Sequence, residues 1–255
     1  MFAVHAWTTS GNPVEHPDPW GLHGAFTTLR KLPGKQFLFL NEHFKRISHS
    51  ASQLGLPWIP GEEELRARLD EFISSTDPQS DQLVRICLFE EILGLSARPA
   101  NSDGNPVEGW LLSYRRPDPA IKCTAEKKLY GCLSELEVEK EDWVIHDPKD
   151  KDLRETATSN LIFVEGNNLL IPEKRVLLGI TLQKLLPLLS SEFFVRRGIP
   201  EDQNISQFDE ILLCGTGRGL APMTALSELG WTSRGTEIFS RIRSLYENLI
   251  QSHCA

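Results

Sequence analysis

The sequence has few of the patterns that mark a membrane, secreted or metal-binding protein. No stretch approaches the roughly 18 to 20 apolar residues of a membrane span, and the first residues, MFAVHAWTTSG, lack a basic start and a long apolar run. The five cysteines are odd in number, and none forms a CxxC pair or a cluster with histidine, so we expect neither a disulfide framework nor a metal site. These absences favour a cytoplasmic protein without an anchor or a targeting segment.

Basic residues are too few and too scattered for a polyanion-binding surface. There are 27 Lys and Arg against 35 Asp and Glu, for a formal net charge of −8, which argues against nucleic acid and anionic membranes as partners. The sequence also lacks the nucleotide-binding motif GxxxxGK[ST], the GxGxxG spacing after a first strand, and any repeat of fixed period. Its 255 residues, 40% of them hydrophobic, suffice for one large domain or two ordinary ones. A small molecule is therefore the favoured partner.

The first half predicts a sheet of about four strands with two helices. Strands are expected at 2–8, 21–30, 36–40, 82–89 and 109–114, the second and third forming a hairpin around Pro33-Gly34. Helices are expected at 41–54, where Asn41 is a favourable N-cap, and at 62–74. Loops are expected at 12–20, which contains three prolines, and at 94–106, which is rich in Gly, Pro, Asn and Ser.

A stiff, exposed connector, Arg115-Arg116-Pro117-Asp118-Pro119, divides the chain. We predict an N-terminal α/β domain at 1–116, a linker at 117–120 and a C-terminal domain at 121–255. In the second domain, helices are expected at 127–136, 182–189 and 236–252, strands at 143–146, 161–165, 169–171 and 211–214, and a surface turn at 147–152. The fold class is α/β (α+β), with a larger second domain.

The polar stretch 154–160 stands directly before the apolar run 161–164. Such a strand is too apolar for the surface, so the polar groups lie at the rim of a buried sheet and need hydrogen-bond partners or a ligand. A polar turn that caps the strand is the simpler interpretation. Glycine-bearing turns at 179–181 and 215–219 offer backbone amides of the kind that bind phosphate. The stretch and the two turns together predict a site for a phosphorylated ligand.

The segments Asn41-Glu42-His43-Phe44-Lys45-Arg46 and Ala120-Ile121-Lys122 resemble two motifs of one known family. It is the family of fold-type IV pyridoxal-phosphate enzymes, or class IV, which comprises branched-chain aminotransferases, D-amino acid aminotransferases and aminodeoxychorismate lyases. Asn41-Glu42-His43-Phe44-Lys45-Arg46 resembles the family's NEHxxR helix, whose arginine binds the cofactor phosphate. Ala120-Ile121-Lys122 resembles the IK dipeptide with the Schiff-base lysine. Lys127 and Lys128 lie nearby, so the residues alone do not single out Lys122. The resemblance implies a two-domain fold with pyridoxal 5'-phosphate between the domains.

Three further segments are similar to family motifs in the same order. Glu155, in a stretch resembling E-G-x-x-x-N, is implied to pair with the pyridine nitrogen. Gly179-Ile180-Thr181 is similar to the phosphate-holding GIT, and Gly215-Thr216-Gly217 with Pro222 resembles GTxxxxxPV. The implied cofactor-binding residues are Arg46, Lys122, Glu155, Thr158, Asn160, Ile180, Thr181, Thr216 and Gly217. Lys122 and Glu155 are the implied catalytic pair: a lysine amine acts as general base at Cα, and an acid opposite the pyridine nitrogen keeps it protonated.

The chain also departs from the family pattern. Leu22-His23-Gly24 and Phe26 stand where many relatives have GDG and a tyrosine, and Leu182 stands where an arginine is common. The strand around Arg85 resembles the branched-chain type, in which the arginine lies near the substrate carboxylate, whereas Phe26-Thr27-Thr28 resembles the lyases. Phe26, Arg85 and Arg218 are the candidate substrate residues.

The predicted function is amino-group transfer from an amino acid to a 2-oxo acid. Two alternatives within the resemblance are an aminodeoxychorismate lyase, which releases pyruvate and 4-aminobenzoate, and a cofactor-binding relative without activity, to which the departures at Phe26 and Leu182 lend weight. A sugar-phosphate or nucleotide-binding module depends only on the glycine turns. The resemblance also implies a homodimer.

Overall fold

The computed structural model of the chain describes residues 3–254, and these divide into two compact units. Unit 1 consists of Met1–Ala100 and Ile121–Tyr130, and unit 2 of Asn101–Ala120 and Gly131–Ala255. This division differs from the predicted domains 1–116 and 121–255. Residues 101–120, most of which were predicted to belong to the first domain, contain a strand in the sheet of unit 2. Residues 121–130, predicted to begin the second domain, belong to unit 1, where residues 122–124 form hydrogen bonds with the strand β3 (Gly24–Lys31).

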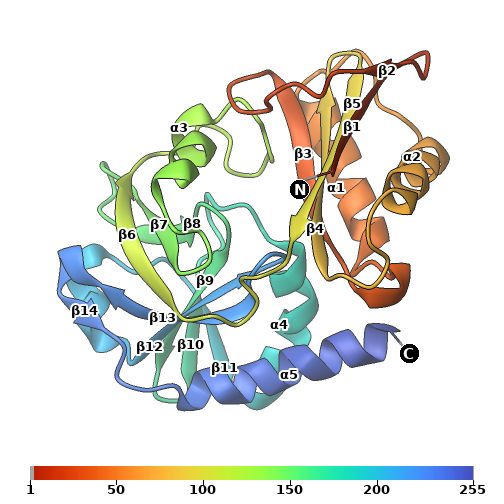
Figure 1. The fold of residues 1–255 in the computed structure, drawn as a ribbon. Coiled ribbons are helices and arrows are strands. Elements are labelled where there is room, and N and C mark those ends of the chain that lie inside the picture. Colours follow the sequence, from red (N-terminus) through yellow and green to blue (C-terminus); the bar gives the residue numbers. More distant parts are fainter. Residues whose placement is uncertain (1–2, 255) are drawn as a thin grey trace. The chain divides into compact units, whose positions relative to one another are not determined.

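Unit 1 is an antiparallel sheet packed against two helices (Figure 1). The strand order is β2-β1-β5-β4-β3, with β1 Ala3–Thr8, β2 Pro13–Val14, β3 Gly24–Lys31, β4 Gln82–Phe89 and β5 Ile92–Pro99. The helices are α1 Leu40–Gln53 and α2 Glu62–Ser74, and a short third helix is α3 Lys127–Tyr130. Alternate residues of β4, among them Val84 and Ile86, face the core that α1 and α2 cover. Arg85 therefore points to the other face of the sheet.

Three predictions for this half need correction. The expected hairpin between 21–30 and 36–40 is reduced to one antiparallel bridge, between Lys31 and Phe37, with the Leu38 amide donating to the Arg30 carbonyl at 3.0 Å. It extends no further because Phe39 adopts a left-handed backbone conformation (φ 55°) and leads directly into α1. The segment 94–99, expected to be a loop, belongs to β5, because Leu95 and Ala97 alternate into the core. The strand expected at 109–114 belongs to unit 2. Phe2, the first residue of the expected strand 2–8, lies outside the described residues.

Unit 2 is built on a mixed nine-stranded sheet that closes on itself. The strands are β6 Val107–Ser113, β7 Glu141–His146, β8 Leu153–Thr156, β9 Asn160–Glu165, β10 Asn168–Ile171, β11 Phe194–Arg197, β12 Glu210–Gly215, β13 Gly219–Leu226 and β14 Trp231–Thr232. The order is β11-β10-β9-β12-β13-β6-β7-β8, with β14 on β13, and β8 pairs back onto β9 through Glu155 and Asn160. β6 runs parallel to both neighbours, β13 and β7. Six strands thus form a ring that closes at the polar stretch.

The central strands of unit 2 are apolar on both faces because both faces are covered. Ile162 of β9 packs in a cluster with α4 (Ile180–Glu192) and α5 (Glu237–Cys254), whereas Phe163 faces a second cluster with residues near the short 3-10 helices Asp202–Gln207 and Ser227–Leu229. Further 3-10 turns are Pro33–Lys35 in unit 1 and Gly131–Glu135 in unit 2. The continuous run 161–164 is thereby explained.

Two expectations for the second half need correction, those for the turn at 147–152 and the helix at 127–136. The turn at 147–152 is not a surface turn throughout: Asp147 and Asp152 are buried, at 2% and 8% exposure, in a network of ion pairs. The expected helix 127–136 ends at Tyr130 and continues only as a 3-10 turn.

Within residues 3–254, no helix has the length and apolar character that crossing a membrane requires.

Buried thiols are unreactive in both units. Burial raises the pKa of the Cys87 thiol to about 12 and that of the Cys214 thiol to about 12, far above neutral pH. Neither side chain forms a disulfide. Because the thiolate is the reactive form, these two cysteines serve packing.

Truncation of a ring in the second cluster should destabilise the protein. Phe163 is fully buried, with its ring 5.0 Å from that of Phe208, so Phe163→Ala should lower the free energy of unfolding by about 3 to 5 kcal/mol. Phe194, which is 64% exposed, provides the matched control, and Phe194→Ala should change it by less than about 0.5 kcal/mol. Urea unfolding followed by tryptophan fluorescence measures both. Equal midpoints for the two variants would contradict the packing described.

Candidate active site

Lys122 lies on a short segment that extends the sheet of unit 1. The amide of Phe26 donates a hydrogen bond to the Lys122 carbonyl (3.0 Å), and the amide of Thr124 donates one to Gly24 (2.8 Å). Ala25 and Cys123 form the bridge between these two bonds. The backbone of Lys122 is therefore held against β3 as an additional edge.

The side chain of Lys122 ends among aromatic rings. Its Nζ lies 4.6 Å from the ring centroid of Phe26 and 5.6 Å from that of Tyr130, an arrangement typical of cation–π contacts. The ring of Trp20 stacks on Tyr130 with centroids 5.0 Å apart. Lys122 is half-buried, whereas Lys127 and Lys128 on α3 are exposed. The structure thus distinguishes Lys122 from its two neighbours, which the sequence did not.

Arg46 on α1 reaches back to β3. Its Nη2 and Nε donate to the Thr27 hydroxyl at 2.7 and 3.2 Å, and Nη2 lies 3.2 Å from His43 Nδ1. The Thr27 hydroxyl lies 2.8 Å from the same ring nitrogen. His43 and Arg46 are three residues apart and so share one face of the helix. This face presents a guanidinium at the strand that carries Phe26.

The buried guanidinium of Arg46 has no negatively charged partner among the described residues. Burial lowers the pKa of Arg46 to about 10, and nearby Tyr130 opposes that shift. Burial, together with the charges of Arg46 and Lys122, holds the pKa of His43 well below its ordinary value, so this histidine is neutral at pH 7. Among residues 3–254, no carboxylate pairs with Arg46. An anionic ligand would supply the missing charge.

Arg85 is a second arginine without an acidic partner in unit 1. Its Nε is buried and has no hydrogen-bond partner within the described chain, and its guanidinium carbon lies 4.6 Å from the ring centroid of Trp20. With Thr28, Ser96 and Arg98 it lines a cavity of about 190 Å³. Polar groups of this kind at a cavity wall fix the orientation of a small anion.

In unit 2, the carboxylate of Glu155 is buried and held from two sides. Oε1 accepts a hydrogen bond from Arg116 Nη1 at 2.9 Å, in an ion pair whose side chains are 4% and 7% exposed. Oε2 accepts one from the Leu177 amide at 3.1 Å. The Arg116 side chain and the Leu177 amide together hold the Glu155 carboxylate in place.

Asn160 joins the polar stretch to the start of α4. Its Nδ2 donates to the Leu177 carbonyl, and its Oδ1 accepts from the Gly179 amide, both at 2.8 Å. A Cβ at residue 179 would lie 2.3 Å from Asn160 Oδ1, so only glycine fits this approach. Gly179 caps α4 without a side-chain bond, and Ile180 and Thr181 form the first turn, whose amides lack intrahelical acceptors. These amides form an anion-binding helix start.

Thr158 and Arg218 belong to a buried network around Asp142. Asp142 Oδ2 accepts from Thr156 Oγ1 at 2.8 Å, from Thr158 Oγ1, and from Arg218 Nε at 3.2 Å. Arg218 is 2% exposed, and its Nη2 also donates to the Glu141 carbonyl. Arg218 Nη1 and Asp142 Oδ1 have no partner among the described residues. The geometry gives Arg218 a structural contact rather than an open, solvent-facing guanidinium.

The turn with Thr216 and Gly217 lies beside the same stretch. Gly215 and Gly219 pair across it, and a Cβ at Gly215 would lie 2.9 Å from Ser159 Oγ. Thr216 and Gly217 are half-buried, and the Gly217 carbonyl accepts a bond from Ser102 at 3.1 Å. The three turns of unit 2 that the sequence singled out are thus brought together.

Sequence reasoning missed four residues of these clusters. Thr27 and Tyr130 contact the cationic groups of unit 1, and Arg116 and Asp142 hold the polar stretch of unit 2. Arg116 was interpreted as part of an exposed connector, whereas its side chain is buried, and Tyr130 was interpreted as one position of a helix. Asp142 lies 14, 16 and 76 residues from its three partners, so no local pattern indicates it.

The donor set fits pyridoxal 5'-phosphate. In unit 1, the buried Arg46 guanidinium without an anion matches a phosphate, and the half-buried Lys122 among rings matches attachment to an aldehyde. In unit 2, the start of α4 matches a phosphate, and the buried Glu155 carboxylate matches a pyridine nitrogen. The fold is that expected of a fold-type IV enzyme, and each unit carries groups that suit this cofactor.

The comparisons with known proteins identify the family. The family model "Amino-transferase class IV" matches residues 24–226. The chain therefore belongs to the class IV aminotransferases, which confirms the predicted fold class, enzyme class and cofactor. A search of curated proteins found no match.

Solved structures share the fold at low sequence identity. A hypothetical aminotransferase from Mycobacterium tuberculosis in its pyridoxal-phosphate-bound form is 17% identical, with a TM-score of 0.76 over 98% of this chain and 99% of that one. The branched-chain aminotransferase of Thermoproteus uzoniensis is 17% identical, with a TM-score of 0.80 over 95% and 93%. That of Escherichia coli is 18% identical, with a TM-score of 0.77 over 94% and 92%.

Loss of Arg218 should destabilise the protein whether or not a cofactor is present. Arg218→Met leaves the fully buried Asp142 carboxylate without its ionic partner, and breaking a buried pair in this way should lower the free energy of unfolding by about 3 kcal/mol. Arg234→Met removes an exposed pair with Asp209 and should cost less than about 1 kcal/mol. Urea titration of the apoprotein measures both. Wild-type stability of Arg218→Met would assign the guanidinium to another role.

Proposed function

We propose that the protein transfers the amino group of an amino acid to a 2-oxo acid, with pyridoxal 5'-phosphate attached to Lys122. The observation that supports this most directly is the pairing, within unit 1, of a half-buried lysine among aromatic rings with a buried arginine that has no acidic partner. Both cations lower the pKa of the same residue, His43, so they belong to one electrostatic environment.

Each residue has a defined task in this proposal. In unit 1, Arg46 is the proposed phosphate ligand. In unit 2, the first amides of α4 suit a phosphate, and the Glu155 carboxylate suits the ring nitrogen. Lys122 would hold the cofactor until the substrate amine takes its place at the aldehyde carbon, and the freed Lys122 amine would then take the proton from the substrate Cα and pass it on. Bound pyridoxal phosphate supplies an aldehyde for attachment to amines and a ring that accepts the electrons of the broken Cα–H bond.

The remaining candidate residues of unit 2 either position the backbone of the site or contact the phosphate directly. Asn160 and Thr158 position the start of α4 and the turn at 216–217, with Arg218 holding Thr158 from behind. Thr216 and Gly217 offer amides and a hydroxyl to the phosphate.

Arg85 is the proposed anchor for a substrate carboxylate. The unpartnered Nε and the neighbouring Thr28, Ser96 and Arg98 suit a small anion. Phe26, with Trp20 beside it at 5.3 Å between ring centroids, offers an apolar wall to the substrate side chain. A homodimer and a cytoplasmic location stay predictions from the sequence.

The reaction is tested by parallel assays of the purified enzyme. Wild type supplied with pyridoxal phosphate should transfer amino groups from a member of a panel of L- and D-amino acids to 2-oxoglutarate. Lys122→Ala should lose this turnover, and borohydride should fix the cofactor on the Lys122 peptide of wild type only. Lys127→Ala, which alters an exposed lysine, is the control and should retain both properties.

The other outcomes identify the alternatives. Pyruvate release from aminodeoxychorismate without amino transfer would make the protein a lyase. A cofactor fixed on Lys122 without turnover on any substrate would make it a binding protein. Attachment to Lys127 or Lys128 would refute the assignment of Lys122.

The phosphate role of Arg46 is tested with two ligands. Arg46→Gln should weaken binding of pyridoxal phosphate by about 1.5 to 3 kcal/mol, the range for hydrogen bonds to charged groups. Binding of pyridoxal, which lacks the phosphate, should be unchanged. Fluorescence titration of the apoprotein measures both affinities. An equal loss for the two ligands would indicate a general disturbance of α1, whereas no loss for either would remove Arg46 from the site.

A further inference from the structure

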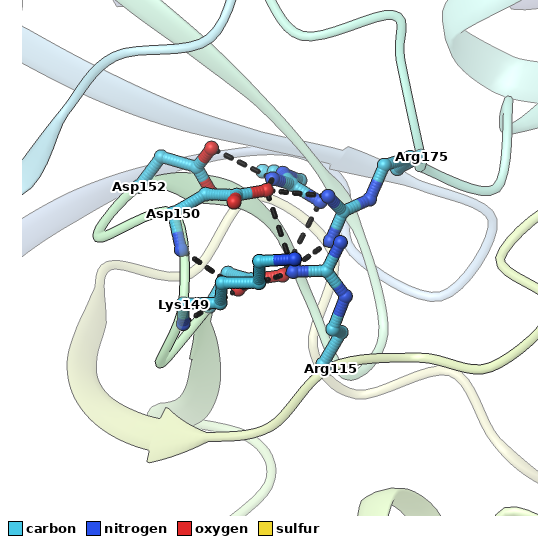
Figure 2. Close-up of polar contacts among 7 residues, drawn as sticks. Arg115, Lys149, Asp150, Asp152 and Arg175 are labelled. Atoms are coloured by element: carbon cyan, nitrogen blue, oxygen red, sulfur yellow. Dashed lines mark hydrogen bonds and ion pairs between the residues drawn. The ribbon is translucent and has the colours of Figure 1, made fainter.

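Arg115, Arg154 and Arg175, from separate segments of unit 2, converge on Asp147 and Asp150. Figure 2 shows Arg115 and Arg175 beside Asp150. Arg115 Nη1 lies 3.1 Å from Asp147 Oδ1 and 3.4 Å from Asp150 Oδ2. Arg154 lies 3.4 Å from Asp147 and 2.7 Å from Asp150. Arg175 uses both terminal nitrogens, one for each aspartate. The two carboxylates therefore tie together residues that are distant in the chain.

The residues that hold Glu155 immediately follow these arginines. The Glu155 carboxylate is bound by the Arg116 side chain at 2.9 Å and by the Leu177 amide at 3.1 Å. Arg116 directly follows the first network arginine, Glu155 directly follows the second, and Leu177 lies two residues after the third. Each of the three segments that determine the position of this carboxylate is thus fixed by the same pair of aspartates.

Backbone strain and charge both indicate that the network holds its segments in place. Arg175 has a φ of 57°, a left-handed conformation that costs a residue with a side chain about 1 kcal/mol or more and persists where the surroundings enforce it. Asp147 is the more deeply placed aspartate. Burial would raise its pKa, but the amides of Asp150 and Lys149 and the charges of Arg154 and Arg115 outweigh this effect and hold the pKa below its ordinary value.

We propose that Asp147 and Asp150 are positioning residues for Glu155. By fixing the three arginine-bearing segments, they keep the Glu155 carboxylate in one position for the ring nitrogen of pyridoxal phosphate. The network contributes geometry and touches neither substrate nor cofactor. The inference depends on the proposed function, in which Glu155 binds that nitrogen.

A double-mutant cycle tests this coupling. The substitution Asp147→Asn keeps an oxygen for the amides of Lys149 and Asp150, at 2.9 and 3.1 Å, but removes the charge that binds the arginines. Dissociation constants for pyridoxal phosphate are measured by fluorescence titration of the apoproteins for wild type, Asp147→Asn, Glu155→Gln and the double variant. We expect Asp147→Asn to weaken binding roughly tenfold in wild type, within the range of couplings between contacting groups, and to add nothing in the Glu155→Gln background.

The outcomes separate this inference from the function on which it depends. An equal loss from Asp147→Asn in both backgrounds, or no loss in either, overturns the positioning role while Glu155 keeps its own. Unchanged affinity in Glu155→Gln overturns both, because the network then has no functional group to position.

Two further measurements guard against a general loss of structure. A cofactor analogue with a CH group in place of the ring nitrogen should have the same affinity for Asp147→Asn as for wild type. If Asp147→Asn loses as much affinity for the analogue as for the cofactor, the proposal is overturned, and this result does not require the double variant to fold. Asp209→Asn is the matched control. Asp209 also accepts from a backbone amide, that of Gly166 at 3.0 Å, and pairs with an arginine, but it contacts none of the Glu155 segments, and its variant should bind the cofactor like wild type.

Discussion

The pairing of β8 with β9 through Glu155 and Asn160 is the constraint from which the organisation of unit 2 follows. It closes six strands into a ring, and it places at the closure two side chains that both reach the loop before α4. A carboxylate and an amide five residues apart thereby fix the helix start relative to the sheet. Because the neighbouring strands β9 and β12 are buried on both faces, most polar groups at this position of the ring are hydrogen-bonded.

Unit 1 follows a different electrostatic principle. Its core is satisfied, but Arg46 and Arg85 are left without carboxylate partners within the described chain, and Lys122 ends over aromatic rings. Holding cations together in a partly buried site is unfavourable for an isolated protein, and such costs persist where function requires them. In the proposed function, the charges of the phosphate and of the substrate carboxylate remove this cost on binding.

The sequence predicted the fold and the candidate residues through local patterns, and its errors arose where distant segments decide the structure. Motifs around Arg46, Lys122, Glu155 and Gly179 are contiguous, so they were visible, and the structure brings the predicted residues of each unit together. Residues 36–40 have a strand-like composition, but the left-handed Phe39 limits the hairpin to a single bridge between Lys31 and Phe37. The charged residues in 147–152 predicted a solvent-exposed turn. Their partners Arg115 and Arg175 are distant in the sequence, so no local pattern indicates that these ion pairs form.

The division of the chain between units has a consequence for its synthesis. The polypeptide passes from unit 1 to unit 2 and back before residue 131, so neither unit is encoded by one uninterrupted segment. The segment at Lys122, which extends the sheet of unit 1 beside β3, is synthesised after β6 of unit 2. The two neighbours of β6 in the sheet, β7 and β13, are synthesised later still. During translation, the edge of β6 that pairs with β13 therefore stays unpaired for more than a hundred residues of elongation, from Val107 to β13 at Gly219–Leu226. The ring of the finished protein covers this edge, which an unpaired strand would leave open to wrong pairing.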